Sequence, residues 1–296
     1  MASNGKKLRA AVLDYAHKLD QSLADWIAGE VAFPDTMVDS ITPATDDRLR
    51  VLVREQGFDD DIPISREAYA AWVIEDVLPS DGPDFAAAGV VIASDVGAWE
   101  RAKLRILNGA HSTLAYVGLL LGHETVAEAM DDPELARFVE RLIREDIIPT
   151  LAPSPLDLRR YASEILERFR NPAIAHKLSQ IAWDGSQKLP YRLVDTIADA
   201  RGAGRMTARL AVPIAAWILF VERQARDGVK IIDPLGPTLA KLGQGYDVVE
   251  RLLGLRQVFP EQLAADENFS ISVTRAADRM RGSGPRSVLS DELANA

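Results

Sequence analysis

Lys103-Leu-Arg-Ile-Leu-Asn-Gly-Ala-His-Ser-Thr-Leu-Ala-Tyr-Val-Gly-Leu-Leu-Leu121 is the stretch that decides the fold. Its dense apolar residues predict a helix in the core of a mainly helical protein. Lys103, Asn108 and His111 are unexpected there, because a buried polar group is costly unless it is satisfied. At about 100° per residue, the three side chains fall within one broad sector of an α-helix.

A buried lysine lowers its own pKa, and can then serve as a general base near neutral pH. The plainer alternative is that Lys103 extends to solvent at a helix end while Asn108 and His111 bond nearby backbone groups. The spacing alone favours this alternative.

Helical periodicity dominates the chain on both sides of this stretch. One helix is predicted near the N-terminus over residues 6–28, with short strands near 31–43, 72–75 and 89–92. After residue 96 we predict helices over 97–121, 123–130, 133–148, 155–170, 171–183, 188–201, 205–226, 234–241, 243–256 and 260–278. The polar residues from 282 onward predict a frayed tail.

Composition excludes several classes of function. The 296 residues carry a net charge of −10, which argues against a nucleic-acid partner, because phosphate binding needs clustered Lys and Arg. Without cysteine the chain has no disulfide or thiolate zinc site, which fits a reducing cytoplasm. The four histidines are scattered, so no metal site is predicted. The longest apolar run, over 210–221, is too short for a bilayer span.

Four blocks of sequence occur in an order that resembles the mannitol dehydrogenase family of polyol-specific long-chain dehydrogenases. The first is the signature Lys-x4-Asn-x2-His, at residues 103–111. The others are Phe33–Pro43, Trp72–Asp76 and Asp184–Pro190. The resemblance extends over nearly the whole chain.

This resemblance implies NAD(P)-dependent, metal-free oxidation of a secondary alcohol, or reduction of the ketone. It implies that Lys103 is the acid/base, that Asn108 donates to the developing alkoxide and that His111 orients the substrate or the lysine. Asp39 matches an acidic residue of the family near the lysine. A turn cap before Ser40 is an equally good interpretation of Asp39.

Residues 180–192 resemble the fructuronate reductase (mannonate oxidoreductase) branch of the family. A sugar acid needs a cation for its carboxylate, and Lys188 and Arg192 are the candidates, with His176 a weaker third. On composition alone, Lys188 would be a solvent-exposed residue at the start of a helix. Two further hypotheses stay open: a mannitol or arabinitol dehydrogenase domain, and a non-catalytic helical remnant that serves as an interaction domain.

The family places its NAD or NADP on an N-terminal Rossmann domain, and no strand followed by Gly-x-Gly-x-x-Gly occurs in this sequence. The near match at 202–207 follows a helical stretch and lacks the last glycine. We therefore predict a mainly α, 6-phosphogluconate-dehydrogenase-like C-terminal domain with a few N-terminal strands and no Rossmann domain.

In this interpretation residues 1–66 are the remnant of the junction with the missing domain, residues 67–282 the helical catalytic domain, and residues 283–296 a polar tail. A misplaced start codon, a split gene or a degraded gene would explain such a chain. A separate Rossmann-domain chain is then a candidate partner, beside a small sugar acid or polyol. Alone, the chain is expected to have little or no activity.

Overall fold

The computed structural model describes residues 3–205 and 208–294, and the chain divides into two compact units, 1–103 and 104–296. This division falls elsewhere than the boundaries at residues 66 and 282 expected from sequence. Residues 206–207 lie outside the described residues, and they belong both to the near fingerprint at 202–207 and to the helix predicted over 205–226. The last two residues of the predicted tail, 295–296, also lie outside them.

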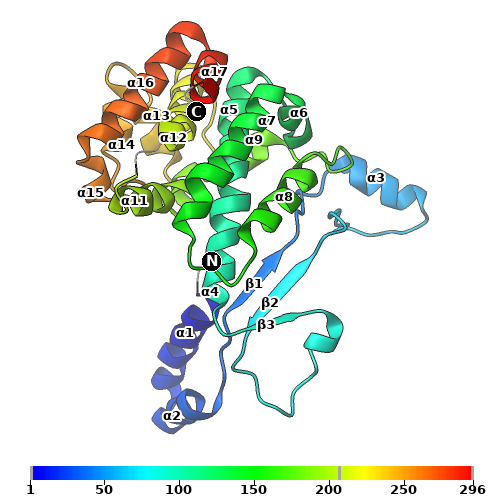
Figure 1. Cartoon of the computed structure of the whole chain (residues 1–296). Coiled ribbons are helices and arrows are strands. Elements are labelled where there is room, and N and C mark those ends of the chain that lie inside the picture. Colours follow the sequence, from blue (N-terminus) through cyan, green and yellow to red (C-terminus); the bar gives the residue numbers. More distant parts are fainter. Residues whose placement is uncertain (1–2, 206–207, 295–296) are drawn as a thin grey trace. The chain divides into compact units, whose positions relative to one another are not determined.

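A three-stranded sheet forms the centre of the first unit (Figure 1). Strand β1 (Thr36–Asp39) pairs antiparallel with β2 (Ala71–Glu75), which pairs in parallel with β3 (Val91–Ala93). Met37 lies opposite Val73 in this register, and both are buried together with Val96 of α4 (Val96–Ala102). Helix α4 packs on β1 and β2, and so brings the chain entering the signature against the sheet.

The helix predicted over 6–28 is two helices, α1 (Asn4–Leu19) and α2 (Gln21–Glu30). Asp20 breaks the helix with an extended backbone and caps α2 through the backbone N–H of Ser22. Large apolar side chains of these helices are exposed, with Tyr15 65% and Trp26 58% accessible. The two helices bury small residues instead, Gly5, Ala16 and Ala24.

Two short elements of the first unit were not predicted from the sequence. Helix α3 (Asp47–Glu55) begins at the cap Asp46 and buries none of its residues. A 3₁₀ turn, η1 (Ala86–Ala88), precedes β3.

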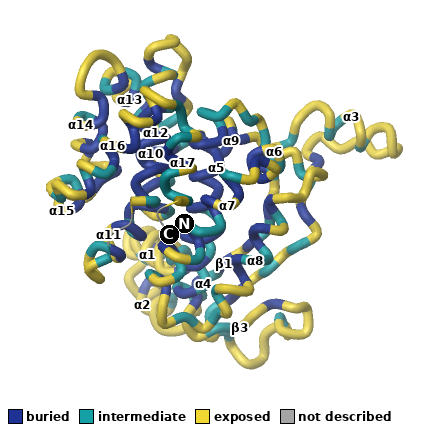
Figure 2. The backbone as a smooth tube through the Cα atoms, turned by 45° about the horizontal axis from the view of Figure 1, so that its top comes forward, coloured by how far each residue is buried: buried dark blue, intermediate teal, exposed yellow. Residues whose placement is uncertain are grey.

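The second unit is helical, and three long helices form its centre: α5 (Asn108–Leu121), α12 (Ala208–Arg226) and α16 (Glu267–Ser283). Helix α12 packs on both α5 and α16, and long runs of α5 and α12 are buried (Figure 2). Around them lie α6 (Val126–Asp131), α7 (Pro133–Arg141), α8 (Leu158–Phe169), α9 (Leu178–Ile181), α10 (Gly185–Leu189), α11 (Asp195–Gly202), α13 (Gly236–Leu242), α14 (Val248–Leu253), α15 (Glu261–Ala264) and α17 (Pro285–Ala294).

Three π-helical turns interrupt the predicted helices: η2 (Lys103–Leu107), η3 (Leu142–Ile147) and η5 (Pro190–Val194). A 3₁₀ turn, η4 (Ile148–Thr150), follows η3. Because a π-helix is wound more loosely than an α-helix, a rotation of about 100° per residue does not apply between residues 103 and 107. The predicted helix over 171–183 is also shorter, since its helical part begins at Leu178.

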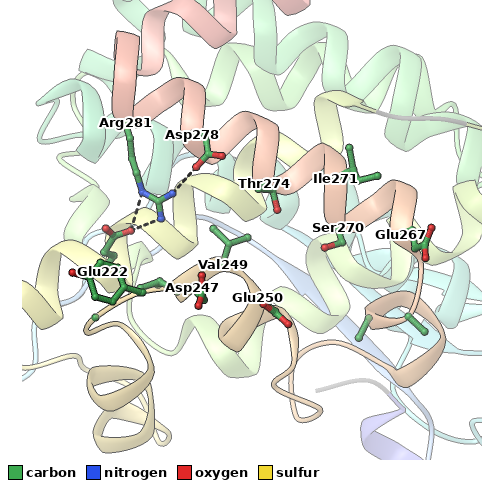
Figure 3. A pocket seen from close by; sticks show the side chains of 15 residues that line it. Glu222, Asp247, Val249, Glu250, Glu267, Ser270, Ile271, Thr274, Asp278 and Arg281 are labelled. Carbon is green, nitrogen blue, oxygen red and sulfur yellow. Dashed lines mark hydrogen bonds and ion pairs between the residues drawn. The ribbon is translucent and has the colours of Figure 1, made fainter.

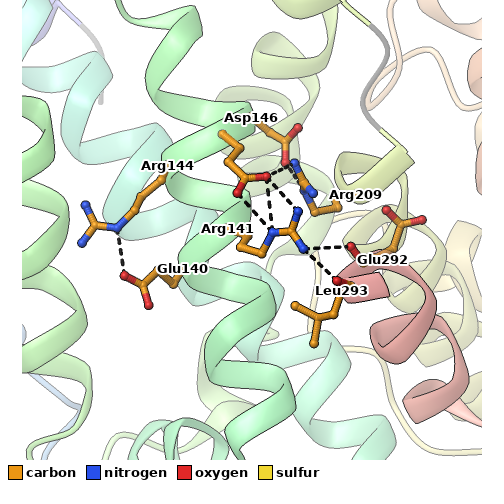
Figure 4. A network of polar contacts seen from close by, with 8 residues as sticks. Glu140, Arg141, Arg144, Asp146, Arg209, Glu292 and Leu293 are labelled. Carbon is orange, nitrogen blue, oxygen red and sulfur yellow. Dashed lines mark hydrogen bonds and ion pairs between the residues drawn. The ribbon is translucent and has the colours of Figure 1, made fainter. Parts of the chain in front are cut away.

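The tail that we predicted to be frayed forms the ordered helix α17, which buries Val288 and Leu289. Arg141 donates to the backbone oxygens of Glu292 and Leu293 at 3.4 and 3.0 Å (Figure 4). These contacts satisfy carbonyls that a helix C-terminus leaves without intrahelical partners. Among the described residues, no helix is both long and apolar enough to cross a membrane.

Candidate functional site

Lys103 lies against strand β1 in the first unit. Its side chain is half-buried, and its Nζ donates a hydrogen bond to the backbone oxygen of Val38. The next residue of the strand, Asp39, is 1% exposed. Lys103 therefore reaches the backbone of the residue that precedes Asp39 at the end of β1, because α4 packs on the sheet.

His111 is held by two rings in the second unit. It is 5% exposed and stacks on Phe169 of α8, with ring centroids 4.4 Å apart. The ring of His176 meets it edge-on at 5.2 Å. The imidazole of His111 is thus fixed from the face and from the edge, so its orientation is set by packing.

Two cations, Lys188 and Arg192, lie near these histidines. Lys188 Nζ donates to the backbone oxygen of Ile181 at 3.4 Å, and Arg192 Nη1 donates to Ser112 Oγ at 3.1 Å. Burial lowers the pKa of Arg192 to about 10. Burial also lowers the pKa of Lys188, and the charge of Arg192 lowers it further.

Neither cation forms an ion pair within 4.0 Å with any carboxylate of residues 3–205 and 208–294. A buried cation is normally paired. The nearest compensation is longer-range, because the charges of Asp184 and Asp233 act on Lys188 without forming an ion pair with it.

His176 shares this environment, in the loop before α9. Burial, followed by the charges of Lys188 and Arg192, lowers its pKa to about 4, so the ring is neutral at pH 7. Its Nδ1 is buried and has no hydrogen-bond partner in the part of the chain that the structure describes. A buried polar atom without a partner calls for an explanation, because most such atoms are satisfied.

Asn108 is the first residue of α5 and is half-buried. Its side-chain amide makes no hydrogen bond to any residue within the described ranges. In the second unit, the fold brings together three stretches of chain: His111 in α5, His176 in the loop before α9, and Lys188 and Arg192 in the consecutive α10 and η5. Lys103 and Asp39 form their own group in the first unit.

Ser112 and Phe169 are the neighbours of this group that sequence reasoning missed. Ser112 is 1% exposed and Phe169 2% exposed. A sequence signal for Ser112 does exist. Ser112 directly follows His111 and lies three residues after Gly109, so it shares one face of the helix with that glycine. Nothing in the sequence distinguishes Phe169 from an ordinary core aromatic.

A cavity of about 810 Å³ lies elsewhere in the second unit, between α14 and α16 (Figure 3). Arg281 pairs there with Glu222 and Asp278, at 2.7 and 2.8 Å. None of the residues singled out in the sequence lines this cavity. Within the described residues, no group of three His, Asp or Glu side chains could hold a metal ion.

Two family models match the chain. The model described as mannitol dehydrogenase C-terminal domain matches residues 95–281. The model described as mannitol dehydrogenase Rossmann domain matches residues 1–85.

Among curated proteins, the chain is 38% identical to D-mannonate oxidoreductase of Escherichia coli, over 96% of this chain and 60% of that protein. It is 34% identical to mannitol 2-dehydrogenase of Aspergillus fumigatus, over 96% of this chain and 58% of that protein.

Among solved structures, it resembles Pseudomonas fluorescens mannitol 2-dehydrogenase in ternary complex with NAD and D-mannitol. The TM-score is 0.87 and the identity 33%, over 99% of this chain and 61% of the other. The chain thus spans about three fifths of the length of these relatives.

The match over residues 1–85 corrects the sequence analysis. The prediction of a helical C-terminal domain without a Rossmann domain is wrong, because these residues belong to the Rossmann model. The interpretations built on it, an inactive truncated domain or a non-catalytic remnant, fall with it. The error came from requiring Gly-x-Gly-x-x-Gly, which marks only the phosphate-binding turn of a Rossmann domain.

Proposed function

Because the chain belongs to the mannitol dehydrogenase family, we propose that it works as a nicotinamide-dependent oxidoreductase. The reaction interconverts a secondary alcohol of an open-chain sugar derivative and the corresponding ketone. The observation that supports this most directly is the signature at residues 103–111, which places an amine, an amide and an imidazole within nine residues. Such a set can move a proton and stabilise charge on an alcohol oxygen.

Lys103 is the proposed acid/base. Oxidation of an alcohol releases the hydroxyl proton as hydride leaves the carbon, and an unprotonated amine can accept that proton. The contact of Lys103 Nζ with the backbone oxygen of Val38 restrains the side chain at the end of β1. Asp39, buried one residue further along, is the proposed carboxylate next to this contact.

Asn108 and His111 are the proposed substrate-orienting groups. The side-chain amide of Asn108 has no hydrogen bond to another described residue, so its N–H groups are available to the substrate oxygen. His111 is packed between Phe169 and His176, so its ring presents one orientation to a bound hydroxyl. Preorganised donors lose little freedom when charge develops on that oxygen.

NAD, when bound, supplies the hydride acceptor. The residues fit the reacting end of this cofactor, because the chain provides a proton acceptor and an amide donor for the alcohol whose hydride is removed. The glycine-rich fingerprint for the pyrophosphate does not occur in the 296 residues. We therefore assign no residue to the cofactor phosphates.

The substrate is proposed to carry a carboxylate. Lys188 and Arg192 form no ion pair within 4.0 Å in residues 3–205 and 208–294, although the charges of Asp184 and Asp233 act on Lys188, and the neutral ring of His176 lies with them. An arginine fork forms strong charge-assisted hydrogen bonds with a carboxylate. A sugar acid such as D-mannonate, the compound named in one relative, meets this requirement better than a neutral polyol.

The experiment is NAD-linked turnover of D-mannonate and D-mannitol by the 296-residue chain and by Lys103→Met. The methionine keeps the side-chain length and removes the amine, so kcat should fall at least about a hundredfold. Lys7→Met, at an exposed lysine, is the matched control and should match the wild type. The proposal fails if the Lys103→Met variant keeps its kcat within threefold, or if the wild type oxidises neither compound.

A further inference from the structure

Arg192 has one side-chain hydrogen bond to a described residue, although its guanidinium carries several N–H donors. The partner is Ser112 Oγ, at 3.1 Å, and the serine is 1% exposed. Burial lowers the pKa of Arg192 to about 10, so the group remains charged at pH 7. A charged fork with a single anchor leaves its other N–H donors without a partner among the described residues, and its direction depends on that anchor.

Gly109, on the same face of α5 as Ser112, lies close to the backbone of the same arginine. A Cβ added at Gly109 would lie 2.8 Å from the backbone oxygen of Arg192, closer than real Cβ atoms approach. Only a residue without a side chain therefore lets η5 come this near to α5. Gly109 and Ser112 are three positions apart, so both face η5, with His111 in the turn between them.

We propose that Ser112 is a positioning residue: by accepting the hydrogen bond from Arg192, it directs the free side of the guanidinium toward the carboxylate of the substrate. Gly109 makes this contact possible by allowing the backbone approach. The inference rests on the proposed function and goes beyond it, because it assigns a role to a buried serine that has no charge and no contact with the reacting atoms. Ser112 sets affinity for the acidic end of the substrate and leaves the hydride-transfer step unchanged.

A double-mutant cycle tests this role. The variants are Ser112→Ala, Arg192→Met and the double variant in the full 296-residue chain. Dissociation constants for D-mannonate and D-mannitol are measured by calorimetry, with KM, kcat and melting temperature alongside. Thr113→Val is the matched control, because Thr113 is equally buried and its hydroxyl donates within α5, to the backbone oxygen of Gly109.

We expect Ser112→Ala to weaken D-mannonate binding about tenfold, the usual scale for a hydrogen bond to a charged group. Its kcat and its affinity for D-mannitol should change less than twofold. In the Arg192→Met background the same substitution should have less than a twofold effect, since the group it positions is gone. Thr113→Val should leave D-mannonate binding unchanged.

Equal effects of Ser112→Ala in both backgrounds would overturn the inference. A Ser112→Ala variant with a lower melting temperature but unchanged affinity for D-mannonate would also overturn it, because that is the result expected if the hydrogen bond only stabilises the fold. Failure of the proposed function is a separate result, because it appears as an absence of NAD-linked turnover by the wild type. Failure of the positioning role appears only in the double-mutant cycle. A wild-type chain that binds no sugar acid overturns the positioning role and the proposed carboxylate substrate, whereas its NAD-linked turnover of D-mannitol would leave the proposed oxidoreductase activity standing.

Discussion

His176 shows how single residues are tuned in this site. Its ring is neutral because burial and two nearby cations disfavour the protonated form, which lowers its pKa to about 4. In the unfolded chain the same ring would titrate near its ordinary value of 6.5. Between the folded and unfolded pKa values of His176, the unfolded state binds a proton that the folded state does not bind. The free energy of unfolding therefore falls as the pH decreases.

We therefore predict that the free energy of unfolding falls by up to about 2 kcal/mol between pH 7 and pH 5 because of His176. In a His176→Gln variant, which does not titrate, this part of the pH dependence should disappear. Urea denaturation at both pH values measures it. His17→Gln, at an exposed histidine, is the control and should keep the wild-type slope. A His176→Gln variant with an unchanged slope would show that another group is responsible.

At the scale of elements, two of the three π-helical turns carry proposed site residues, Lys103 in η2 and Arg192 in η5. In η5 the backbone N–H of Asp195 donates to the oxygen of Pro190, five residues back. Such turns are rare and frequently occur at functional sites, where they shift the side chains that follow. The close approach of η5 to α5 at Gly109 then determines where Arg192 lies.

Gly109→Ala is predicted to separate these two elements. Its new Cβ would press on the backbone oxygen of Arg192, which cannot rotate away as a side chain could. We expect the free energy of unfolding to fall by about 1–3 kcal/mol and D-mannonate binding to weaken. Gly202→Ala is the control, because a Cβ there meets no atom within 4 Å. Equal stability of the two variants would refute the close approach.

At the scale of the molecule, buried apolar residues are unevenly shared between the units. The first unit has a small cluster around Met37, Val73 and Val96, and α3 buries nothing. In the second unit, α5 and α12 are buried along most of their length (Figure 2). Local stability follows buried apolar contact, so the units should differ in how easily they open.

Hydrogen exchange followed by mass spectrometry should detect this difference. Amides in the middle of α5 and α12 should exchange at least roughly a hundredfold more slowly than those of α1 and α3. Adding NAD and D-mannonate together should slow exchange around Arg192 if the substrate binds there. Equal protection of α3 and α12 in the free chain would contradict the burial pattern.

Several features followed from the sequence alone. The three strands lie close to their predicted positions, and most of the helices after residue 96 were predicted, because apolar periodicity reports burial wherever an element faces a core. The family also followed, since the signature and its three companion blocks are linear patterns. The exposed faces of α1 and α2 could not be predicted, because periodicity does not reveal what covers a face.

Only the tertiary structure decided which side chains share an environment. The grouping of His111 with His176, Lys188 and Arg192, and the hydrogen bond from Arg192 to Ser112, join segments about eighty residues apart. Local sequence determined the types of residue and the helices that carry them, because propensity and periodicity act over a few turns. Which charges lie near a residue, and where two backbones approach closely, depend on long-range packing. In this protein that packing depends on the π-helical turn η5 and on Gly109.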